Sequence, residues 1–243
     1  MRLEEKIKKL IDGQAFASIT RHVRSLFHRL FFPSPIKPKQ IIASIEGHNR
    51  FHEICDRYGM EDPGEGPPKF LNLERWIRRN AKRVRELRLD DQKRRHVLDL
   101  GCGPGYFLYI CRCLGHDVLG IDIDEVPMYG ELTQLLEVPR VIWRIEPFVP
   151  LPDLGQFDVI TSFLTCFNEP IGPGLWGIAE WDFFLDDIRR HVLPNGCLWF
   201  ELNRQSNGQP YSPALKRFFK SRGARIDLYR VMFTSDRLAR SSA

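Results

Sequence analysis

Residues 97–105 read Val-Leu-Asp-Leu-Gly-Cys-Gly-Pro-Gly, a short apolar run followed at once by three alternating glycines. The apolar run is typical of a buried strand, and the glycines predict a tight turn from that strand into a helix. Glycine has no Cβ, so the backbone can take positive φ and approach a ligand closely, and the next helix offers free N–H groups at its start. This stretch therefore predicts a ligand-binding turn in an α/β sheet.

The spacing of these glycines separates two classes of nucleotide site. Dinucleotide-binding turns follow the pattern G-x-G-x-x-G. Here the third glycine is Gly105, and Tyr106 stands where that pattern has its last glycine. The sequence therefore disfavours NAD binding and favours a different ligand at the turn.

An acidic residue follows the second expected strand, which ends Gly120-Ile121-Asp122-Ile123-Asp124. Ligands of parallel sheets bind in the crevice at the carboxyl ends of the strands. A carboxylate at Asp122 would lie there, next to the glycine turn, and could accept hydrogen bonds from both hydroxyls of a ribose. Asp124 is the alternative, although an exposed helix-capping aspartate explains it better.

Strand-like and helix-like stretches alternate from residue 96 onward. We expect strands at 96–100, 117–121, 140–144, 157–162 and 196–202, and helices near 105–115, 126–136, 179–193 and 212–222. Leu193-Pro194-Asn195-Gly196 is a stop signal for the third helix. Residues 225–234 resemble one further strand, without a clear turn for a terminal hairpin. The alternation predicts an α/β, doubly wound, mostly parallel Rossmann-like sheet.

The first 95 residues are expected to form helices outside the sheet. Residues 15–32 have apolar side chains at helical spacing with basic residues around them. Residues 1–40 carry nine Lys and Arg against three Asp and Glu, a net charge of +6. Further helices are expected near 43–58 and 71–88. We therefore divide the chain into a basic amphipathic arm (1–40), a helical cap (41–95) and a Rossmann-like domain (96–243).

The helix near 71–88 has an apolar stripe and many cations. The stripe is expected to face the core, and a solvated outer face is the favoured interpretation of the cations, which are Arg75, Arg78, Arg79, Lys82, Arg83 and Arg85.

Composition limits the cellular setting. No apolar run reaches about 18 residues, and the N-terminus lacks the compact apolar stretch of a secretory signal. We expect a cytoplasmic protein, with residues 1–32 available to rest on a membrane surface or a partner. The six cysteines contain no C-x-x-C pair, so reduced thiols and no metal site are expected.

An ordered series of motifs over residues 96–203 resembles the class I S-adenosylmethionine-dependent methyltransferases. The series consists of Asp99 with the glycines of the turn, Asp122, Glu146 after the third strand, Phe157-Asp158-Val159-Ile160 as the fourth strand, and Leu193–Gly196 before the fifth. The family's usual sheet has seven strands, six parallel and one antiparallel. The resemblance implies S-adenosylmethionine as methyl donor.

The resemblance also implies a set of donor-binding residues. The turn would pass beneath the methionine and ribose parts, Asp122 with Ile123 would hold the ribose, Glu146 would lie near adenine, and Phe163 would line the methionine end. The turn residues in this set are Asp99, Gly101, Cys102, Gly103 and Gly105. Pro147 departs from the family pattern because proline offers no backbone N–H to adenine. That contact is expected to shift to Phe148 or to a side chain.

Methyl transfer from a sulfonium is an in-line displacement whose leaving thioether needs no proton. Positioning and exclusion of water can therefore supply much of the acceleration, and only an acceptor with a high pKa needs a base. If a base exists, His48 and His52 are our candidates, with Glu180 next. The acceptor pocket is expected from 48–58 and from the aromatic segment after the fourth strand.

Three functions remain open at this point. The favoured one is methylation of a small molecule, lipid or glycan precursor. The second is methylation of RNA through the basic helix at 71–88, which the acidic stretch of Glu180, Asp182, Asp186 and Asp187 disfavours because it would repel a polyanion. The third is a catalytically silent protein that keeps the fold and interacts through residues 1–40.

Overall fold

The computed structural model describes residues 35–59, 66–165, 167, 175–205 and 207–238. The pattern of contacts divides the chain into two units, which meet between Lys37 and Pro38. The fold described in this section is that of the second unit, from Pro38 onward. The helix expected at 15–32 lies outside the described residues. Within those residues, no helix combines the length and the apolar character that crossing a membrane requires.

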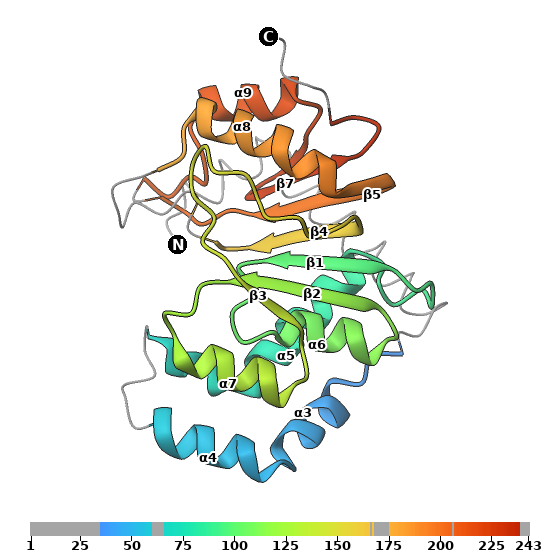
Figure 1. Cartoon of the computed structure of the whole chain (residues 1–243), viewed down its shortest axis with the longest axis vertical. Helices are drawn as coiled ribbons and strands as arrows, with labels where there is room; N and C mark the ends of the chain where they lie inside the picture. The colour runs from blue at the N-terminus through green and yellow to red at the C-terminus, as the bar shows by residue number, and fades with distance from the viewer. Residues whose placement is uncertain (1–34, 60–65, 166, 168–174, 206, 239–243) are drawn as a thin grey trace, which may run out of the picture. The chain divides into compact units, whose positions relative to one another are not determined.

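The described residues form a seven-stranded sheet with strand order β3-β2-β1-β4-β5-β7-β6 (Figure 1). Strand β7 runs antiparallel to both of its neighbours, and the other strand pairs are parallel. The strands are β1 (His96–Leu100), β2 (Asp117–Asp122), β3 (Arg140–Ile142), β4 (Phe157–Phe163), β5 (Val192–Glu201), β6 (Arg225–Asp227) and β7 (Arg230–Thr234). This arrangement confirms the predicted fold class.

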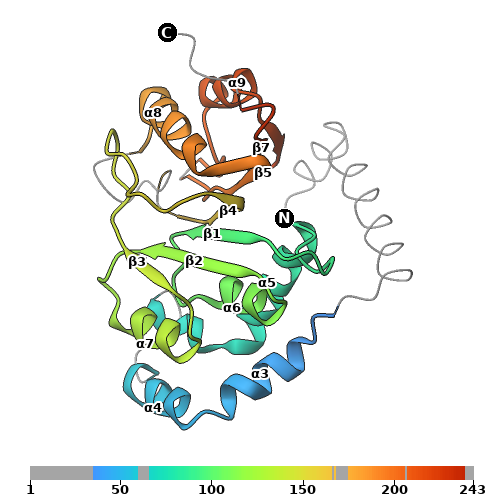
Figure 2. The same ribbon diagram turned by 45° about the vertical axis from the view of Figure 1, so that its right-hand side comes forward.

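Helices flank the sheet along its length. Helices α6 and α7 lie beside β1 to β3, whereas α8 and α9 lie beside β5 and β7 (Figures 1 and 2). The helices are α3 (Pro38–Glu46), α4 (Asn49–Tyr58), α5 (Leu73–Glu86), α6 (Tyr106–Cys113), α7 (Pro127–Leu135), α8 (Ile178–Ile188) and α9 (Pro213–Ser221), with short 3-10 turns η1 (Pro67–Leu71) and η3 (Arg189–His191).

Local chemistry fixes where these helices begin. The Asn72 side chain accepts a hydrogen bond from the backbone N–H of Arg75 at 2.9 Å and so caps α5. Ser212 caps α9 in the same way, and Pro213 follows it at a helical position where its missing N–H is not needed. Helix α5 thereby starts at a defined point above the carboxyl ends of the strands.

An aromatic core fills the space under α8 and α9. The Trp181 ring is fully buried, with centroid distances of 5.7 Å to Phe200 on β5 and 5.1 Å to Phe219 on α9. Edge-on contacts of this kind stabilise a core beyond the area that they bury. The core fixes β5 and hence the residues at its carboxyl end.

Three elements differ from the sequence-based expectations. Leu193–Gly196 does not end a helix before β5 but lies within β5, as an irregularity in its pairing with β4, and Asn195 there has φ of +65°. The single strand expected over 225–234 is two strands, β6 and β7, which form the terminal hairpin around Leu228 with φ of +56°. The helix expected near 43–58 is divided into α3 and α4 by Gly47 and His48.

Candidate active site

A cavity of about 640 Å³ lies at the carboxyl ends of β1, β2 and β4. The strand order changes direction between β1 and β4, which is where ligands bind in open α/β sheets. Its walls come from the turn after β1, the ends of β2 and β4, the loop after β3, and the cap elements η1 and α5. The cap therefore contributes directly to the site.

The glycine turn forms one wall of this cavity. Gly101, Gly103 and Gly105 all have positive φ, at +72°, +53° and +78°. A Cβ on Gly101 would stand 2.7 Å from the Thr165 hydroxyl, whereas a Cβ on Gly103 would meet no atom of the described residues within 4 Å. Gly103 also lines the cavity, so its open side is space that a ligand can use.

Asp122 lies at the end of β2 and faces the same space. Its carboxylate accepts hydrogen bonds from the backbone N–H groups of Gly103 and Ile123, the second at 2.8 Å. Burial raises the pKa of Asp122, and these two bonds act against that rise. A carboxylate oxygen has two lone pairs, so each oxygen keeps capacity for a ligand hydroxyl.

Asp99 lines the cavity from within β1 and is almost fully buried. It accepts a hydrogen bond from the Thr161 hydroxyl at 2.7 Å. Burial nevertheless raises the pKa of Asp99 to about 8, against the opposing effects of Thr161 and of the Arg83 charge. A positively charged ligand group beside Asp99 would favour its ionised form.

The loop after β3 supplies the wall on the far side of Asp122. Glu146 and Pro147 line the cavity, together with Trp143. Phe148 does not: its side chain is 54% exposed and its ring lies against Phe183 at 5.9 Å. The structure therefore gives no support to Phe148 as the replacement for the contact that Pro147 lacks.

The segment after β4 is held in a fixed position. Leu164 has φ of +60°, and its carbonyl accepts a hydrogen bond from the Asn203 amide at 3.0 Å. The Thr165 hydroxyl lies 2.6 Å from that of Ser162 and donates to the Leu100 carbonyl at 3.0 Å. These bonds keep Phe163 and Thr165 on the cavity wall.

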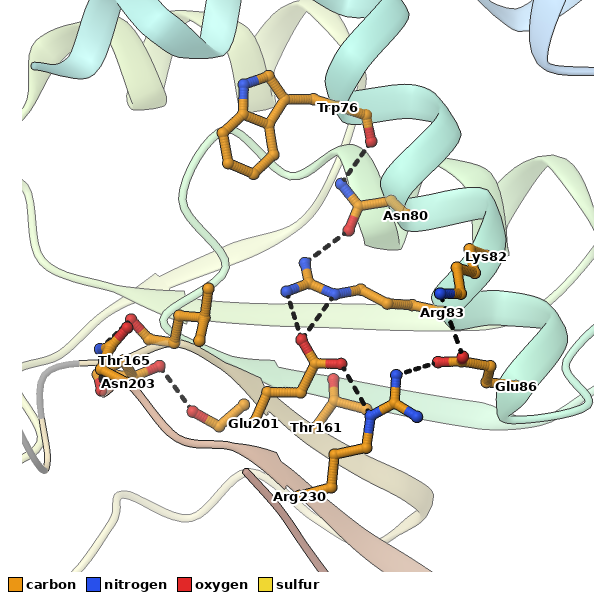
Figure 3. Close-up of polar contacts among 12 residues, drawn as sticks. Trp76, Asn80, Lys82, Arg83, Glu86, Thr161, Thr165, Glu201, Asn203 and Arg230 are labelled. Carbon is orange, nitrogen blue, oxygen red and sulfur yellow. Dashed lines mark hydrogen bonds and ion pairs between the residues drawn. The ribbon is translucent and has the colours of Figure 1, made fainter. Parts of the chain in front are cut away.

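Helix α5 contributes a buried polar network, and here the expectation of a solvated face was wrong for Arg83. The Arg83 and Glu201 side chains are only 8% and 3% exposed, and Arg83 Nη2 lies 2.7 Å from Glu201 Oε2. Arg83 Nη1 donates to Asn80 Oδ1 at 2.9 Å, and its guanidinium carbon lies 3.9 Å from the Phe163 ring centroid. Figure 3 shows Trp76, Asn80 and Arg83 on the same side of α5, with Arg83 reaching Glu201 at the end of β5.

This network continues onto the antiparallel strand. Arg230 of β7 forms an ion pair with Glu86 at the end of α5 and lies 3.5 Å from Glu201 Oε1 (Figure 3). Two arginines and two glutamates thus compensate one another in a buried setting, where an unpaired charge would be costly. The network therefore joins α5 to two strands of the sheet, β5 and β7.

The three candidate bases lie elsewhere. His48 precedes α4 and His52 lies on its exposed side. The Glu180 carboxylate accepts a hydrogen bond from the backbone N–H of Gly177 at 2.9 Å, at the start of α8. None of the three lies among the described residues that line the cavity.

The acidic stretch on α8 also has a structural role. Asp182 and Asp186 both form ion pairs with the buried Arg222, the residue that follows α9, and Asp187 accepts a hydrogen bond from the Leu151 N–H at 2.7 Å. None of these three residues lines the cavity. The structure therefore gives no support to the expectation that they lie near its mouth and repel a polyanion.

The sequence predicted residues on one side of the cavity and missed most of those on the opposite side. Trp76, Asn80, Arg83 and Asn203 line the cavity, and Glu201 positions Arg83. One signal was available: Trp76, Asn80 and Arg83 are spaced i, i+4, i+7 and therefore share a face with the apolar stripe of the helix.

Comparisons with known proteins agree with this geometry. A family model described as "Methyltransferase domain" matches residues 73–207, which is more than half of the chain. A comparison with curated proteins found no match.

Solved structures of low identity also match the chain. A TehB-like S-adenosylmethionine-dependent methyltransferase from Corynebacterium glutamicum is 21% identical over 66% of this chain and 98% of that chain, with a TM-score of 0.45. The PH0226 protein of Pyrococcus horikoshii is 22% identical over 51% and 56%, with a TM-score of 0.40. CalS10, an amino pentose methyltransferase from Micromonospora echinaspora solved with S-adenosylmethionine bound, is 21% identical over 68% and 56%, with a TM-score of 0.36. The match spans about half the length of the last two chains.

Proposed function

The chain belongs to the class I S-adenosylmethionine-dependent methyltransferase family, and from this premise we propose that it methylates a small-molecule acceptor inside the cavity above β1 and β4. S-adenosylmethionine is the methyl donor of the family. When bound, it supplies an electrophilic methyl group on a sulfonium. The protein's contribution is to bind both reactants, orient them and exclude water.

The residues of one half of the cavity fit the donor. The open side of Gly103 leaves room for ligand atoms against the backbone. Asp122 offers a carboxylate to a ribose diol, and Asp99 offers one to an ammonium group. Glu146 and Trp143 close the adenine side. These groups bind and orient the donor, and the transfer of the methyl group itself requires no proton from any of them.

The residues of the other half are available to the acceptor. Asn80, Arg83 and Asn203 supply polar groups there, and Trp76, Phe167 and Trp176 supply aromatic surface. Asn80 Nδ2 gives one of its two N–H groups to the Trp76 carbonyl at 3.0 Å, which leaves the other for a ligand oxygen. An aromatic wall with a few placed polar groups is typical of a small-molecule site.

The main support for the proposal is that the residues suited to the donor and those suited to the acceptor line one cavity beside α5. A volume of 640 Å³ falls in the range of small-molecule and cofactor sites, about 300–1,000 Å³. The burial of Arg83 supports this choice over RNA, because it removes one of the cations on which an RNA site would depend. A small molecule, a lipid headgroup or a glycan precursor fits this description.

Two measurements test the proposal. Isothermal titration calorimetry with S-adenosylmethionine should give saturable binding, and absence of binding at millimolar ligand would favour the catalytically silent alternative. The protein is then incubated with methyl-tritiated donor and with size-separated fractions of cell extract, using Asp122→Asn, which should bind the donor more weakly, as the control. Label in the fraction of small molecules supports the proposal, and label in RNA overturns it.

A further inference from the structure

We propose that the acceptor carries a phosphate or diphosphate group and that two arginines of α5, Arg75 and Arg79, bind this group at the edge of the cavity. The inference rests on the proposed function and deepens it, because it names the chemical class of the acceptor. The inference is based on the residues that surround Trp76, which lines the cavity.

Both arginines lie against the Trp76 ring. The guanidinium carbon of Arg75 lies 5.3 Å from the ring centroid, and that of Arg79 lies at the same distance. Trp76 is itself fixed, because its indole N–H donates to the Lys69 carbonyl at 2.7 Å and its ring lies 4.4 Å from that of Phe70. The two cations therefore occupy defined positions beside a wall of the cavity.

These two arginines differ from their neighbours on the same helix. Arg78 faces Glu74, Lys82 faces Glu86, and Arg83 faces Glu201. For Arg75 and Arg79, the described part of the chain supplies the aromatic contact but no carboxylate within ion-pair distance. Among the described residues, no carboxylate therefore balances the positive charge on this side of α5.

For Arg79, a positive charge without a nearby carboxylate among the described residues is energetically unfavourable. It is partly buried, and it lies one helical turn from Arg75 on one side and from Arg83 on the other, where like charges repel. Burial lowers the pKa of Arg79, the Arg83 charge acts in the same direction, and Glu201 opposes both. Glu201 is already engaged by Arg83 and Arg230. An anion from solution would supply the missing counter-charge.

A phosphate group matches this pair in charge and in shape. Two guanidinium groups carry two positive charges, which balance a phosphate at neutral pH, whereas a carboxylate balances only one of them. The planar fork of arginine also donates two parallel hydrogen bonds to phosphate oxygens. With the anionic group held beside Trp76, the rest of the acceptor extends along the wall formed by Trp76 and Asn80.

The test uses the full chain, sodium pyrophosphate as probe, and saturating S-adenosylhomocysteine to fill the donor site. Calorimetry measures pyrophosphate binding to the wild type, to Arg75→Gln/Arg79→Gln and to the matched control Arg78→Gln/Lys82→Gln. The control removes the same charge from the same helix at positions that face glutamates. Loss of two charge-assisted bonds should weaken binding about tenfold or more in the first variant and less than about twofold in the control.

Several results would overturn the inference. Equal losses in the two double variants would show general attraction to a basic helix, and wild-type protein that fails to bind pyrophosphate at millimolar concentration would exclude the site. A second titration omits S-adenosylhomocysteine. Pyrophosphate binding that is seen only in this titration would place the anion at the glycine turn. Tighter binding of a short single-stranded RNA through the same arginines would identify a polynucleotide acceptor. Because S-adenosylhomocysteine binding is measured on the same samples, its absence would indicate failure of the proposed function separately.

Discussion

At the scale of single residues, Gly103 and Gly115 allow the same substitution to be compared inside and outside the cavity. Both have positive φ, and in the part of the chain that the structure describes an added Cβ would meet no atom within 4 Å at either position. Alanine at each site should therefore lower the free energy of unfolding by a similar amount, about 1 kcal/mol, through backbone strain. Only Gly103 lines the cavity, so only Gly103→Ala should weaken S-adenosylmethionine binding in calorimetry. Equal affinities of the two variants would contradict the position assigned to the donor.

Asp122 and Asp124 allow a second paired comparison. Asp122 lines the cavity, whereas Asp124 is largely exposed and forms an ion pair with Arg140. Asp122→Asn should weaken donor binding by about 1.5–3 kcal/mol, the usual contribution of hydrogen bonds to a charged group. Asp124→Asn should leave the dissociation constant within about twofold of the wild type. The reverse order would transfer the ribose contact to Asp124.

Asp99 gives the site a defined response to pH. Because the folded-state pKa is about 8 and the unfolded-state value is near 3.8, the folded protein holds a proton over this interval that the unfolded chain releases. The free energy of unfolding should therefore fall as pH rises from about 4 to 8, and Asp99→Asn should remove this contribution. Urea unfolding across that range measures both.

The same group couples donor binding to proton release. The donor's ammonium group favours ionised Asp99, so affinity should rise with pH up to about 8 and level off above it. Calorimetry in two buffers of different ionisation enthalpy counts the released protons at pH 7. Asp99→Asn should release none of them, and an unchanged proton count in that variant would refute the assignment.

At the scale of elements, the link between α5 and β5 depends on one buried ion pair. Arg83→Met leaves Glu201 without its main partner and should lower the free energy of unfolding by about 3–5 kcal/mol. The double variant Arg83→Met/Glu201→Leu removes both charges and should recover a large part of that loss. Urea titrations of the two single variants and the double variant measure the coupling, and simple additivity of the single losses would argue against it.

The sequence predicted the elements whose signals are local. The apolar run at 97–100 and the glycines after it determine a strand and a turn within nine residues, and the structure has both where expected. These features depend on a few neighbouring positions and need no knowledge of the rest of the chain.

Elements that depend on distant partners were harder to predict. Arg83 appears as one cation among many on α5, and only the presence of Glu201 at the end of β5 makes its burial favourable. Leu193–Gly196 has the composition of a turn, yet pairing with β4 keeps it within β5. Leu228 gave no turn signal, although the chain reverses there to form the β6–β7 hairpin. In each case the deciding contact lies on another strand.

At the scale of the whole molecule, the part of the chain from Pro38 onward contains every described residue that lines the cavity. A variant that lacks residues 1–37 should therefore fold and bind S-adenosylmethionine with a dissociation constant within about twofold of the full chain, corresponding to less than about 0.5 kcal/mol. Thermal unfolding and calorimetry on both forms test this. A loss of donor binding would assign the basic arm a role in the site itself.

The long sequence separation of the α5 contacts has a consequence for synthesis on the ribosome. Arg83 precedes Glu201 by 118 positions, and Glu86 precedes Arg230 by 144. At a translation rate of about 5–20 residues per second, several seconds pass between the emergence of α5 and that of its partners. During this interval the nascent chain holds the glycine turn, Asp122 and the helices α3 and α6 that pack against α5, but it lacks the ion pairs that join α5 to β5 and β7. The cavity wall formed by α5 is therefore tied to the sheet only after Glu201 and Arg230 have been synthesised, so a chain that stops before Glu201 should not bind S-adenosylmethionine as tightly as the full chain.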